Sequence, residues 1–288
     1  MLSPRERRLL YDLGRGWTGA GAIVDAGAFL GGSTTALAAG LRDRPGRPPG
    51  ARVVSYDRFV VEPYTVDEFF SGAGAPGMGE SFRAQFEANL GDLAPLVEVR
   101  AGDIRQLGWD GTPIEVLFLD VLKSWDLNDF VLREFGPHVS PGSTIVQQDY
   151  LWGQNPWVQI TMEVLDDWLE LVDAMWNGSA VYRVRGPLPP EALASGVAKL
   201  APDEKLALLD RAIARWSGAE RGMLECGRAM LLGEQLGPDA ARRQLALVRH
   251  EFARAPMVMD CAERVEESLE PATSGRTAGI PGPSRCGP

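Results

Sequence analysis

The sequence has little cysteine, little histidine and less positive than negative charge. Its 288 residues include three cysteines and two histidines, with 29 lysine and arginine residues against 39 aspartate and glutamate residues. Cys226, Cys261 and Cys286 lie far apart with no C-x-x-C spacing, which argues against a zinc knuckle or a disulfide framework and favours a reducing cytoplasm. The net charge of -10 disfavours a nucleic-acid partner, because such binding relies on clustered basic residues.

Long hydrophobic runs are also missing. The stretch 18–41 carries a single charge, Asp25, but it contains six glycines. A central carboxylate makes a membrane-spanning helix costly, so we predict a strand, a loop and a helix here and no membrane partner. Residues 9–17 include Asp12 and Arg15 and are too polar for the apolar part of a signal peptide. A small molecule or another protein is the expected partner.

Short apolar runs alternate with helical patterns over the first two thirds of the chain. Strands are expected at 22–25, 52–57, 96–100, 114–119 and 143–147, and helices at 33–41, 81–90, 127–135 and 156–169. This alternation implies right-handed crossovers and a parallel sheet covered on both faces. The runs 171–176 and 180–184 flank Asn177-Gly178, which predicts an antiparallel hairpin at the end of the sheet.

The last third of the chain has a different character. After Pro187, Pro189 and Pro190 only helical patterns follow, at 203–216, 220–236, 238–253 and 257–269. The segment 271–288 is rich in glycine, proline and serine, which predicts a disordered tail. We therefore predict three parts: a sheet domain at 1–186, a helical segment at 187–270 and a tail at 271–288. The helical segment either caps the active site or forms a homodimer interface.

A glycine-containing motif joins the first strand to the first helix of the sheet. It reads D-x-G-x-x-x-G-x-S, from Asp25 through Gly27 and Gly31 to Ser33. Glycines here let the backbone pass close to a ligand, and the helix N-terminus and Ser33 supply donors. The junction lies where ligands bind to doubly wound sheets, although the G-x-G-x-x-G spacing of dinucleotide folds is absent. The alternative interpretation is a tight turn that packs a helix.

Two further carboxylates follow the next two strands. Asp57 ends the second strand, where it is placed to accept both hydroxyls of a ribose. Asp103 and Ile104 follow the third strand. Each acid taken singly is also consistent with a helix cap or a solvated loop.

The ends of the fourth and fifth strands carry the most specific group. Asp120 and Lys123 follow one strand, and Gln148 and Asp149 follow the other. Neighbouring parallel strands place their ends on one rim of the sheet, so two carboxylates and a carbonyl oxygen from Gln148 would form an oxygen-only site. Such a site suits magnesium. The alternatives are a metal-free site that orients substrate by hydrogen bonds and, for Lys123, a surface lysine that starts a helix.

These motifs together resemble a known family. D-x-G-x-x-x-G-x-S resembles the first motif of class I S-adenosylmethionine-dependent methyltransferases. D-x-x-K, the acid after the fifth strand and the loop G-A-F-L-G-G-S are similar to catechol O-methyltransferase and its bacterial relatives. The related macrolide-sugar O-methyltransferases and cephalosporin-hydroxylase-like proteins are also similar, but they have a histidine where Lys123 stands and an acidic pair where this chain has Gln148-Asp149. The resemblance covers about residues 18–185.

The resemblance implies a fold, an activity and a set of site residues. The fold would be a Rossmann-like class I methyltransferase α/β sheet, mostly parallel with an antiparallel terminal hairpin strand, followed by a C-terminal all-helical extension. The activity would be O-methylation of a phenol, catechol or sugar, in bacterial specialised metabolism. S-adenosylmethionine would contact nine residues: Asp25, Gly27, Ala28, Phe29, Gly31, Ser33, Asp57, Asp103 and Ile104.

The resemblance also assigns the chemistry of the acceptor side. Asp120, Gln148 and Asp149 would hold Mg²⁺, and Lys123, its pKa depressed by the cation and by desolvation, would be the base. The chain departs from the family at Tyr150, where the catechol enzymes have asparagine, and at Gln148, where the sugar enzymes have glutamate. Loss of that charge should weaken metal binding.

Aromatic residues near these strand ends are candidates for the acceptor pocket. They are Tyr64, Trp125, Tyr150 and Trp152, which would otherwise be core residues. The glycine-rich loop 71–79 is a candidate lid. An alternative function is an S-adenosylmethionine-binding protein of the same fold with no methyl transfer and a partner-binding role. Lys123 beside two carboxylates argues against it.

Overall fold

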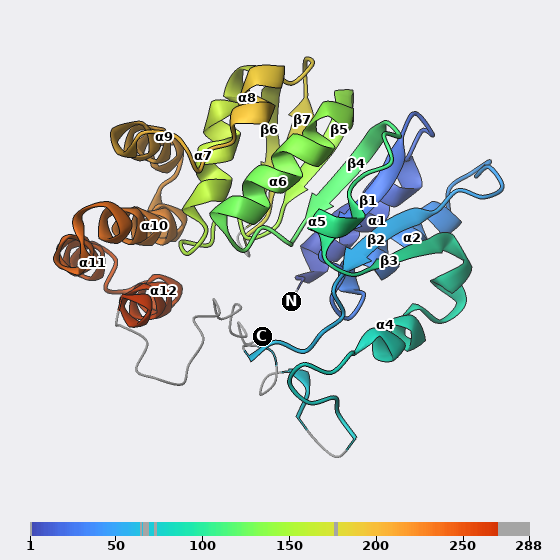
Figure 1. Ribbon diagram of the computed structural model, residues 1–288, viewed down its shortest axis with the longest axis horizontal. Coiled ribbons are helices and arrows are strands. Elements are labelled where there is room, and N and C mark those ends of the chain that lie inside the picture. Colours follow the sequence, from blue (N-terminus) through green and yellow to red (C-terminus); the bar gives the residue numbers. More distant parts are fainter. Residues whose placement is uncertain (1, 64, 66–68, 72–73, 176–177, 270–288) are drawn as a thin grey trace.

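A central sheet with helices on both faces forms most of the molecule, and a group of C-terminal helices lies at one end of it (Figure 1). The computed structural model describes residues 2–63, 65, 69–71, 74–175 and 178–269. Its strands are β1 (Ala22–Ala26), β2 (Val53–Asp57), β3 (Val97–Ala101), β4 (Ile114–Leu119), β5 (Val139–Gln147), β6 (Leu169–Ala174) and β7 (Ala180–Val184). Its helices are α1 (Pro4–Gly16), α2 (Gly32–Arg42), α4 (Arg83–Leu90), α5 (Ile104–Leu107), α6 (Trp125–Phe135), α7 (Pro156–Val164), α8 (Pro190–Ser195), α9 (Pro202–Ala214), α10 (Gly218–Leu236), α11 (Pro238–Glu251) and α12 (Pro256–Ser268). Short 3₁₀ turns lie at Gly91–Leu96, Gly136–His138 and Asp166–Trp168.

The seven strands lie in the order β3-β2-β1-β4-β5-β7-β6. β1 to β5 pair in parallel, whereas β7 is antiparallel to both of its neighbours, β5 and β6. This is the sheet of the class I methyltransferase fold, and the predicted fold class is confirmed. The predicted hairpin pairing is present, but Asn177 at its turn lies outside the described residues.

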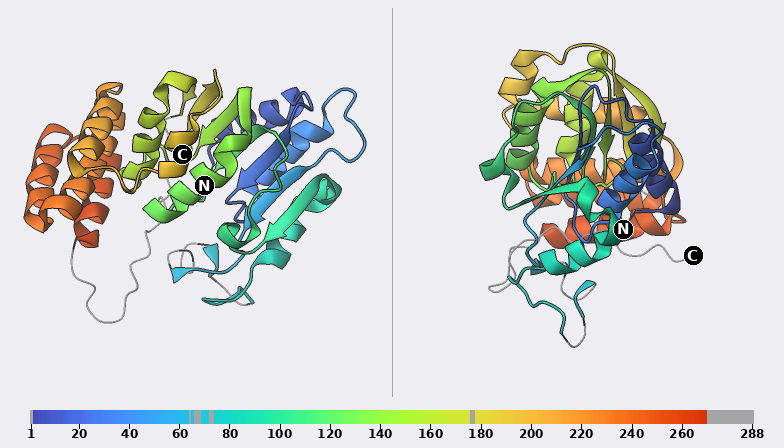
Figure 2. Two further views of the ribbon diagram at one scale, coloured as in Figure 1. Left: turned by 45° about the horizontal axis from the view of Figure 1, so that its top comes forward. Right: turned by 90° about the vertical axis from the view of Figure 1, so that its right-hand side faces the viewer.

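The parallel strands bury side chains on both faces. On β1, Ile23 belongs to a hydrophobic cluster with side chains from α1, α2 and α4. Its neighbour Val24 belongs to a second hydrophobic cluster, with side chains from α6 and α7. Successive residues of a strand point to opposite faces, so an unbroken apolar run is what a doubly covered strand requires. Figure 2 shows the two helical layers from other directions. The ends of the strands are not covered by these two layers and are therefore the first place to look for a ligand site.

The C-terminal helices attach to the sheet close to the predicted acceptor side. Leu209 of α9 and Leu224 of α10 belong to the main core, while α10, α11 and α12 enclose a smaller core that also holds Trp152. A Cβ on Gly153 would lie 2.3 Å from the carbonyl oxygen of Met223, so only glycine allows α10 to approach so closely. The helices thus pack on the segment that follows Asp149. The division into 1–186 and 187–270 stays a prediction, and the tail 271–288 lies outside the described residues.

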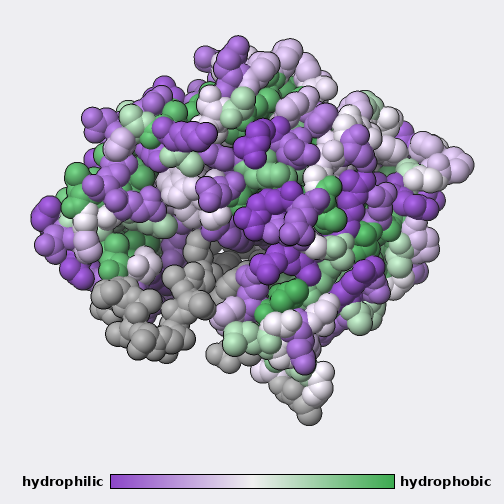
Figure 3. All heavy atoms as spheres, in the orientation of Figure 1, coloured by the Kyte–Doolittle hydropathy of each residue, from purple (hydrophilic) through white to green (hydrophobic). Residues whose placement is uncertain are grey.

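The sequence analysis did not predict α1, α5 or α8. α1 begins with a capping box, in which Ser3 Oγ accepts from the Glu6 amide and Glu6 accepts from the Ser3 amide. It packs tightly on α2, where a Cβ at Gly40 would lie 2.0 Å from the Tyr11 carbonyl oxygen. Within the described part of the chain no helix is both long and apolar enough to cross a membrane. Hydrophobic residues on the face in Figure 3 lie in small groups among hydrophilic ones.

Candidate functional site

Asp25, the first residue of the glycine motif, lies entirely inside the protein. It has no exposed surface, and it accepts hydrogen bonds from Ser33 Oγ at 3.0 Å and Thr34 Oγ1 at 2.5 Å. Burial raises the pKa of this carboxyl to about 7, although the two hydroxyl donors oppose the shift. The predicted contacts of Asp25 and Ser33 with a cofactor stay predictions. Their polar groups bind each other and hold the loop to the start of α2.

The loop between them passes close to the end of β4. Gly27 has φ +102°, and a Cβ there would lie 2.6 Å from the carbonyl oxygen of Asp120. Ala28 is buried, and Gly31, with φ +93°, precedes the first turn of α2. Phe29 has φ +46°, an uncommon conformation for a bulky residue, and its amide donates to Asp57 Oδ2 at 2.8 Å. The loop is thus fixed against three neighbouring strand ends.

Gly27→Ala is expected to destabilise the protein through the contact with Asp120. The left-handed backbone alone costs an L residue about 1–2 kcal/mol, and overpacking adds about 1–3 kcal/mol. Gly142→Ala is a matched control, because Gly142 has φ +95° but nothing within 4 Å of its Cβ position. Urea unfolding of both variants should show the larger loss for Gly27→Ala. Equal losses would mean that the contact with Asp120 contributes nothing.

Asp57 and Asp103 follow neighbouring strands but have different surroundings. Asp57 accepts from the Phe59 amide at 2.6 Å and from the Phe29 amide at 2.8 Å, and burial raises its pKa. Each carboxylate oxygen keeps a further lone pair, so Asp57 can still accept a ligand hydroxyl. Asp103 instead caps α5 and pairs with Arg105 at 2.6 Å, a contact that lowers its pKa to about 2. Ile104 is buried beneath it.

The structure brings Asp120, Lys123 and Asp149 together. Lys123 Nζ lies 2.8 Å from Asp120 Oδ1 and 2.6 Å from Asp149 Oδ2. The exposed fractions of the three side chains are 38% for Lys123, 32% for Asp120 and 9% for Asp149, so the group lies at the surface but is partly shielded. Asp149 has φ +59°, in the left-handed region. The lysine bridges two carboxylates that come from adjacent strand ends.

The protonation of this group differs from the sequence-based expectation. Burial alone would lower the pKa of Lys123, but Asp120 and Asp149 together raise it well above its usual value. Burial raises the pKa of Asp120 above its usual range, and Lys123 opposes this. The depressed lysine pKa was expected beside a bound cation, and for that state it stays a prediction. Lys123 is an ammonium group here.

Gln148, the third predicted metal ligand, makes contacts elsewhere. Its side-chain amide lies 2.6 Å from Ser179 Oγ, which in turn lies 2.6 Å from Glu6 Oε1. A single hydroxyl proton cannot serve both neighbours, so we assign the amide NH₂ as donor to Ser179 and Ser179 as donor to Glu6. Among the residues described, no three or more histidine, cysteine, aspartate or glutamate side chains converge to hold a metal. This donor set does not fit the predicted magnesium site.

Glu6 and Ser179 were not predicted from the sequence. Both are buried, with 1% and 0% of their surface exposed. The pattern S-x-x-E marks Glu6 as the start of a helix, but no sequence signal connects it to a residue more than 170 positions away.

The aromatic residues assigned to the acceptor pocket are mostly core. Tyr150 is fully buried and its ring packs 6.0 Å from those of Tyr182 and Trp216. Trp152 belongs to the small core of the C-terminal helices. The C-terminal part of the chain covers these side chains, and their assignment to the acceptor pocket stays a prediction. Trp125 is partly exposed, with Lys205 Nζ 4.4 Å from its ring centre, and stays a prediction. Tyr64 lies outside the described residues.

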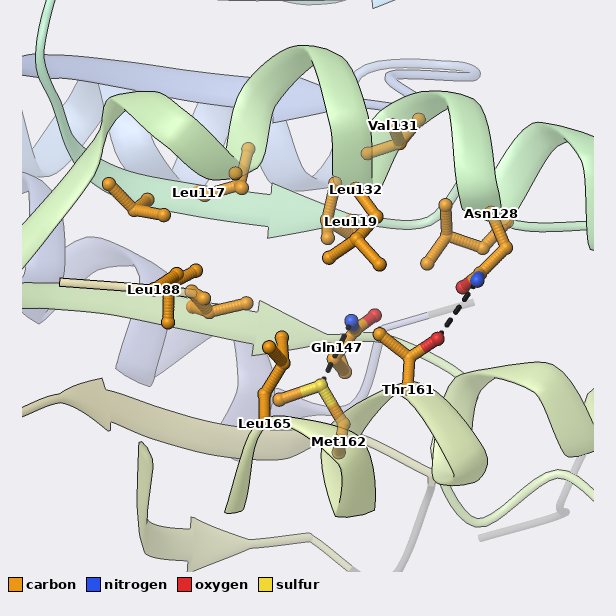
Figure 4. A pocket seen from close by; sticks show the side chains of 14 residues that line it. Leu117, Leu119, Asn128, Val131, Leu132, Gln147, Thr161, Met162, Leu165 and Leu188 are labelled. Carbon is orange, nitrogen blue, oxygen red and sulfur yellow. Dashed lines mark hydrogen bonds between the residues drawn. The ribbon is translucent and has the colours of Figure 1, made fainter. Parts of the chain in front are cut away.

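An apolar cavity lies between the sheet and helices α6 and α7 (Figure 4). Apolar side chains line most of it, among them Leu117 and Leu119 of β4 and Leu132 of α6, and Gln147 is one of its few polar side chains. The side-chain NH₂ of Gln147 donates to Met162 Sδ at 3.4 Å, whereas its side-chain oxygen Oε1 has no hydrogen-bond partner among the described residues. None of Lys123, Asp149 or the glycine loop lines this cavity. It is therefore separate from the group at the strand ends.

Comparison with known proteins gives similar structures only. No family model and no curated protein matches the chain. The calicheamicin methyltransferase CalS11 is 20% identical over 62% of this chain and 76% of its own, with a TM-score of 0.45. The O-methyltransferase NovP is 18% identical over 62% and 77%, with a TM-score of 0.46. The B. subtilis tRNA methyltransferase TrmK is 11% identical over 92% of this chain and 99% of its own, with a TM-score of 0.39.

Proposed function

We propose that this protein is an S-adenosylmethionine-dependent methyltransferase that acts on a hydroxyl group of a small molecule. The observation that carries the proposal is the convergence of three features at one edge of the sheet. These are the loop at Gly27, the carboxylate of Asp57, and Lys123 between Asp120 and Asp149. The strand order with an antiparallel β7 supports the same assignment.

The cofactor side of the proposed site is built from β1 and β2. Asp57 would accept the ribose hydroxyls with the lone pairs that its two amide contacts leave. The backbone from Gly27 to Gly31 would lie against the methionine part, because no side chain at Gly27 intervenes. S-adenosylmethionine, when bound, supplies an electrophilic methyl group.

The acceptor side is built from the ends of β4 and β5. The Lys123 ammonium has a third N–H that can bind the acceptor oxygen and stabilise the negative charge that develops on it. Asp120, whose pKa burial raises, can take the hydroxyl proton. The oxygen–methyl bond then forms as the sulfur–methyl bond breaks. This arrangement gives the base role to Asp120 and makes Lys123 the cation that orients the acceptor.

The proposed function can be tested in two steps. Calorimetry should detect binding of S-adenosylhomocysteine to the wild-type protein, and Asp57→Ala should weaken it. Incubation with methyl-labelled S-adenosylmethionine and a panel of phenols, catechols and sugars should transfer label to one class. A folded protein that does not bind S-adenosylhomocysteine would contradict the proposal. Binding with no transfer to any acceptor would favour the noncatalytic alternative.

A further inference from the structure

The cation at the acceptor side of this site belongs to the protein itself. Lys123 Nζ lies between carboxylate oxygens of Asp120 and Asp149, at 2.8 and 2.6 Å. Two carboxylates at neighbouring strand ends provide the kind of oxygen ligands that bind a divalent cation between them. We propose that the ammonium of Lys123 is the resident cation of this site, so that Asp120 and Asp149 bind no divalent metal while Lys123 is present.

The backbone holds both carboxylates where the ammonium meets them. The Asp120 amide donates to the Ala26 carbonyl at 2.8 Å, and the Asp120 carbonyl lies against Gly27. The Asp149 carbonyl accepts from the Trp152 amide at 2.9 Å. Asp149 has a left-handed backbone, so its side chain does not continue the alternating directions of the side chains along β5. A divalent ion would therefore have to displace the ammonium, because two like charges cannot share the gap without repulsion.

The remaining predicted ligand does not compensate for that repulsion. The Gln148 amide is 2.6 Å from Ser179, and the Ser179 hydroxyl contacts Glu6, so both groups are committed to a buried network. A metal bound by Asp120 and Asp149 alone would have only two protein carboxylates, both already paired with the Lys123 ammonium. Magnesium is usually held by one or two carboxylates with several waters, so a bound ion would have to take both carboxylates from the ammonium.

The choice of lysine at this position is itself informative. The chain has only three lysines, at positions 123, 199 and 205. In the part of the chain that the structure describes, the ion pairs away from Lys123 are formed by arginines, as in Arg215 with Glu163. A lysine ammonium is a compact point charge, whereas the arginine fork is planar and larger. Arg215 also pairs with two carboxylates, but its shortest contacts to them come from different nitrogens. The single Nζ of Lys123 meets both of its carboxylates, as a metal ion would.

Manganese binding tests this inference without any turnover. The full chain, in the wild-type form and as Lys123→Met, is titrated with Mn²⁺ alone and followed by electron paramagnetic resonance. We expect only nonspecific binding in the wild-type protein and one new site in Lys123→Met, with a Kd lower than that of the nonspecific binding by roughly tenfold or more. Lys123→Met combined with Asp149→Asn should lose that site. Lys199→Met is the matched control, because Lys199 is exposed, and it should behave as the wild type does.

Two results of the manganese titration would contradict the inference. Wild-type binding of Mn²⁺ that Asp149→Asn abolishes would overturn the inference, and so would a folded Lys123→Met variant without a new site. Circular dichroism checks the fold, and Lys123→Gln replaces the methionine variant if that one is unfolded. S-adenosylhomocysteine binding, measured on the same samples, reports on the proposed function separately. If both proposals hold, methyl transfer will proceed unchanged after exhaustive chelation.

Discussion

Lys123→Met is expected to lose methyl transfer by roughly 100-fold to 10,000-fold while it still binds S-adenosylhomocysteine. The substitution keeps the length of the side chain but removes the charge between Asp120 and Asp149. The acceptor oxygen then loses its donor, and two carboxylates are left to repel the anion that must develop on it. The cofactor side, formed by Gly27 and Asp57, does not contact the ammonium and should be unaffected.

Lys123→Arg distinguishes an orienting cation from a base. Arginine keeps the positive charge but does not lose its proton, although its larger fork will bind the two carboxylates less well. We expect its activity to lie between those of the wild type and Lys123→Met. The measurement is label transfer to the acceptor found for the wild type, with calorimetry of S-adenosylhomocysteine as control. Activity of Lys123→Arg above that of Lys123→Met would show that Lys123 need not act as a base, because arginine does not lose its proton. Wild-type rates in Lys123→Met would reject the site.

The fold was predictable from the sequence because doubly covered strands leave a plain signal. The run Val53–Asp57 has apolar side chains toward both helical layers, and the helices α9 to α12 begin and end within two residues of their predicted bounds. α1 was not predicted, although Ser3 and Glu6 form a recognisable capping box. Its exposed face is rich in arginine, so its apolar stripe is narrow and depends on packing against α2.

The candidate site was predictable only in its outline. Adjacent parallel strands end on one rim, which was enough to place Asp120, Lys123 and Asp149 together. The direction of each side chain was not predictable, because it depends on strand alternation and on local backbone. Gln147 points toward α7 and Gln148 toward α1, on opposite faces. Tyr150 was assigned to a pocket because the sequence did not indicate that Trp216, which follows α9, packs against its ring.

The buried carboxyl of Asp25 should make the stability of the protein depend on pH. Its pKa is raised from 3.8 to about 7 in the folded protein, so the folded state binds the proton more tightly than the unfolded state does. The stability that protonation supplies is complete below the unfolded pKa and is lost as pH rises through about 7. Each unit of pKa difference corresponds to about 1.4 kcal/mol, so the total loss is about 4 kcal/mol at most.

Asp25→Asn removes this titration while it keeps an acceptor oxygen for Ser33 or Thr34. The substitution also changes the free energy of unfolding through the altered hydrogen bonds, but this change is the same at every pH. The stability of Asp25→Asn relative to the wild type should therefore be about 2–3 kcal/mol more favourable at pH 8 than at pH 5. Urea unfolding at the two pH values measures this difference, with the exposed Asp167→Asn as control. A difference that does not change between pH 5 and pH 8 would mean that Asp25 stays ionised in the folded protein. A carboxylate that stays ionised with only two hydroxyl donors would imply that a cation compensates its charge.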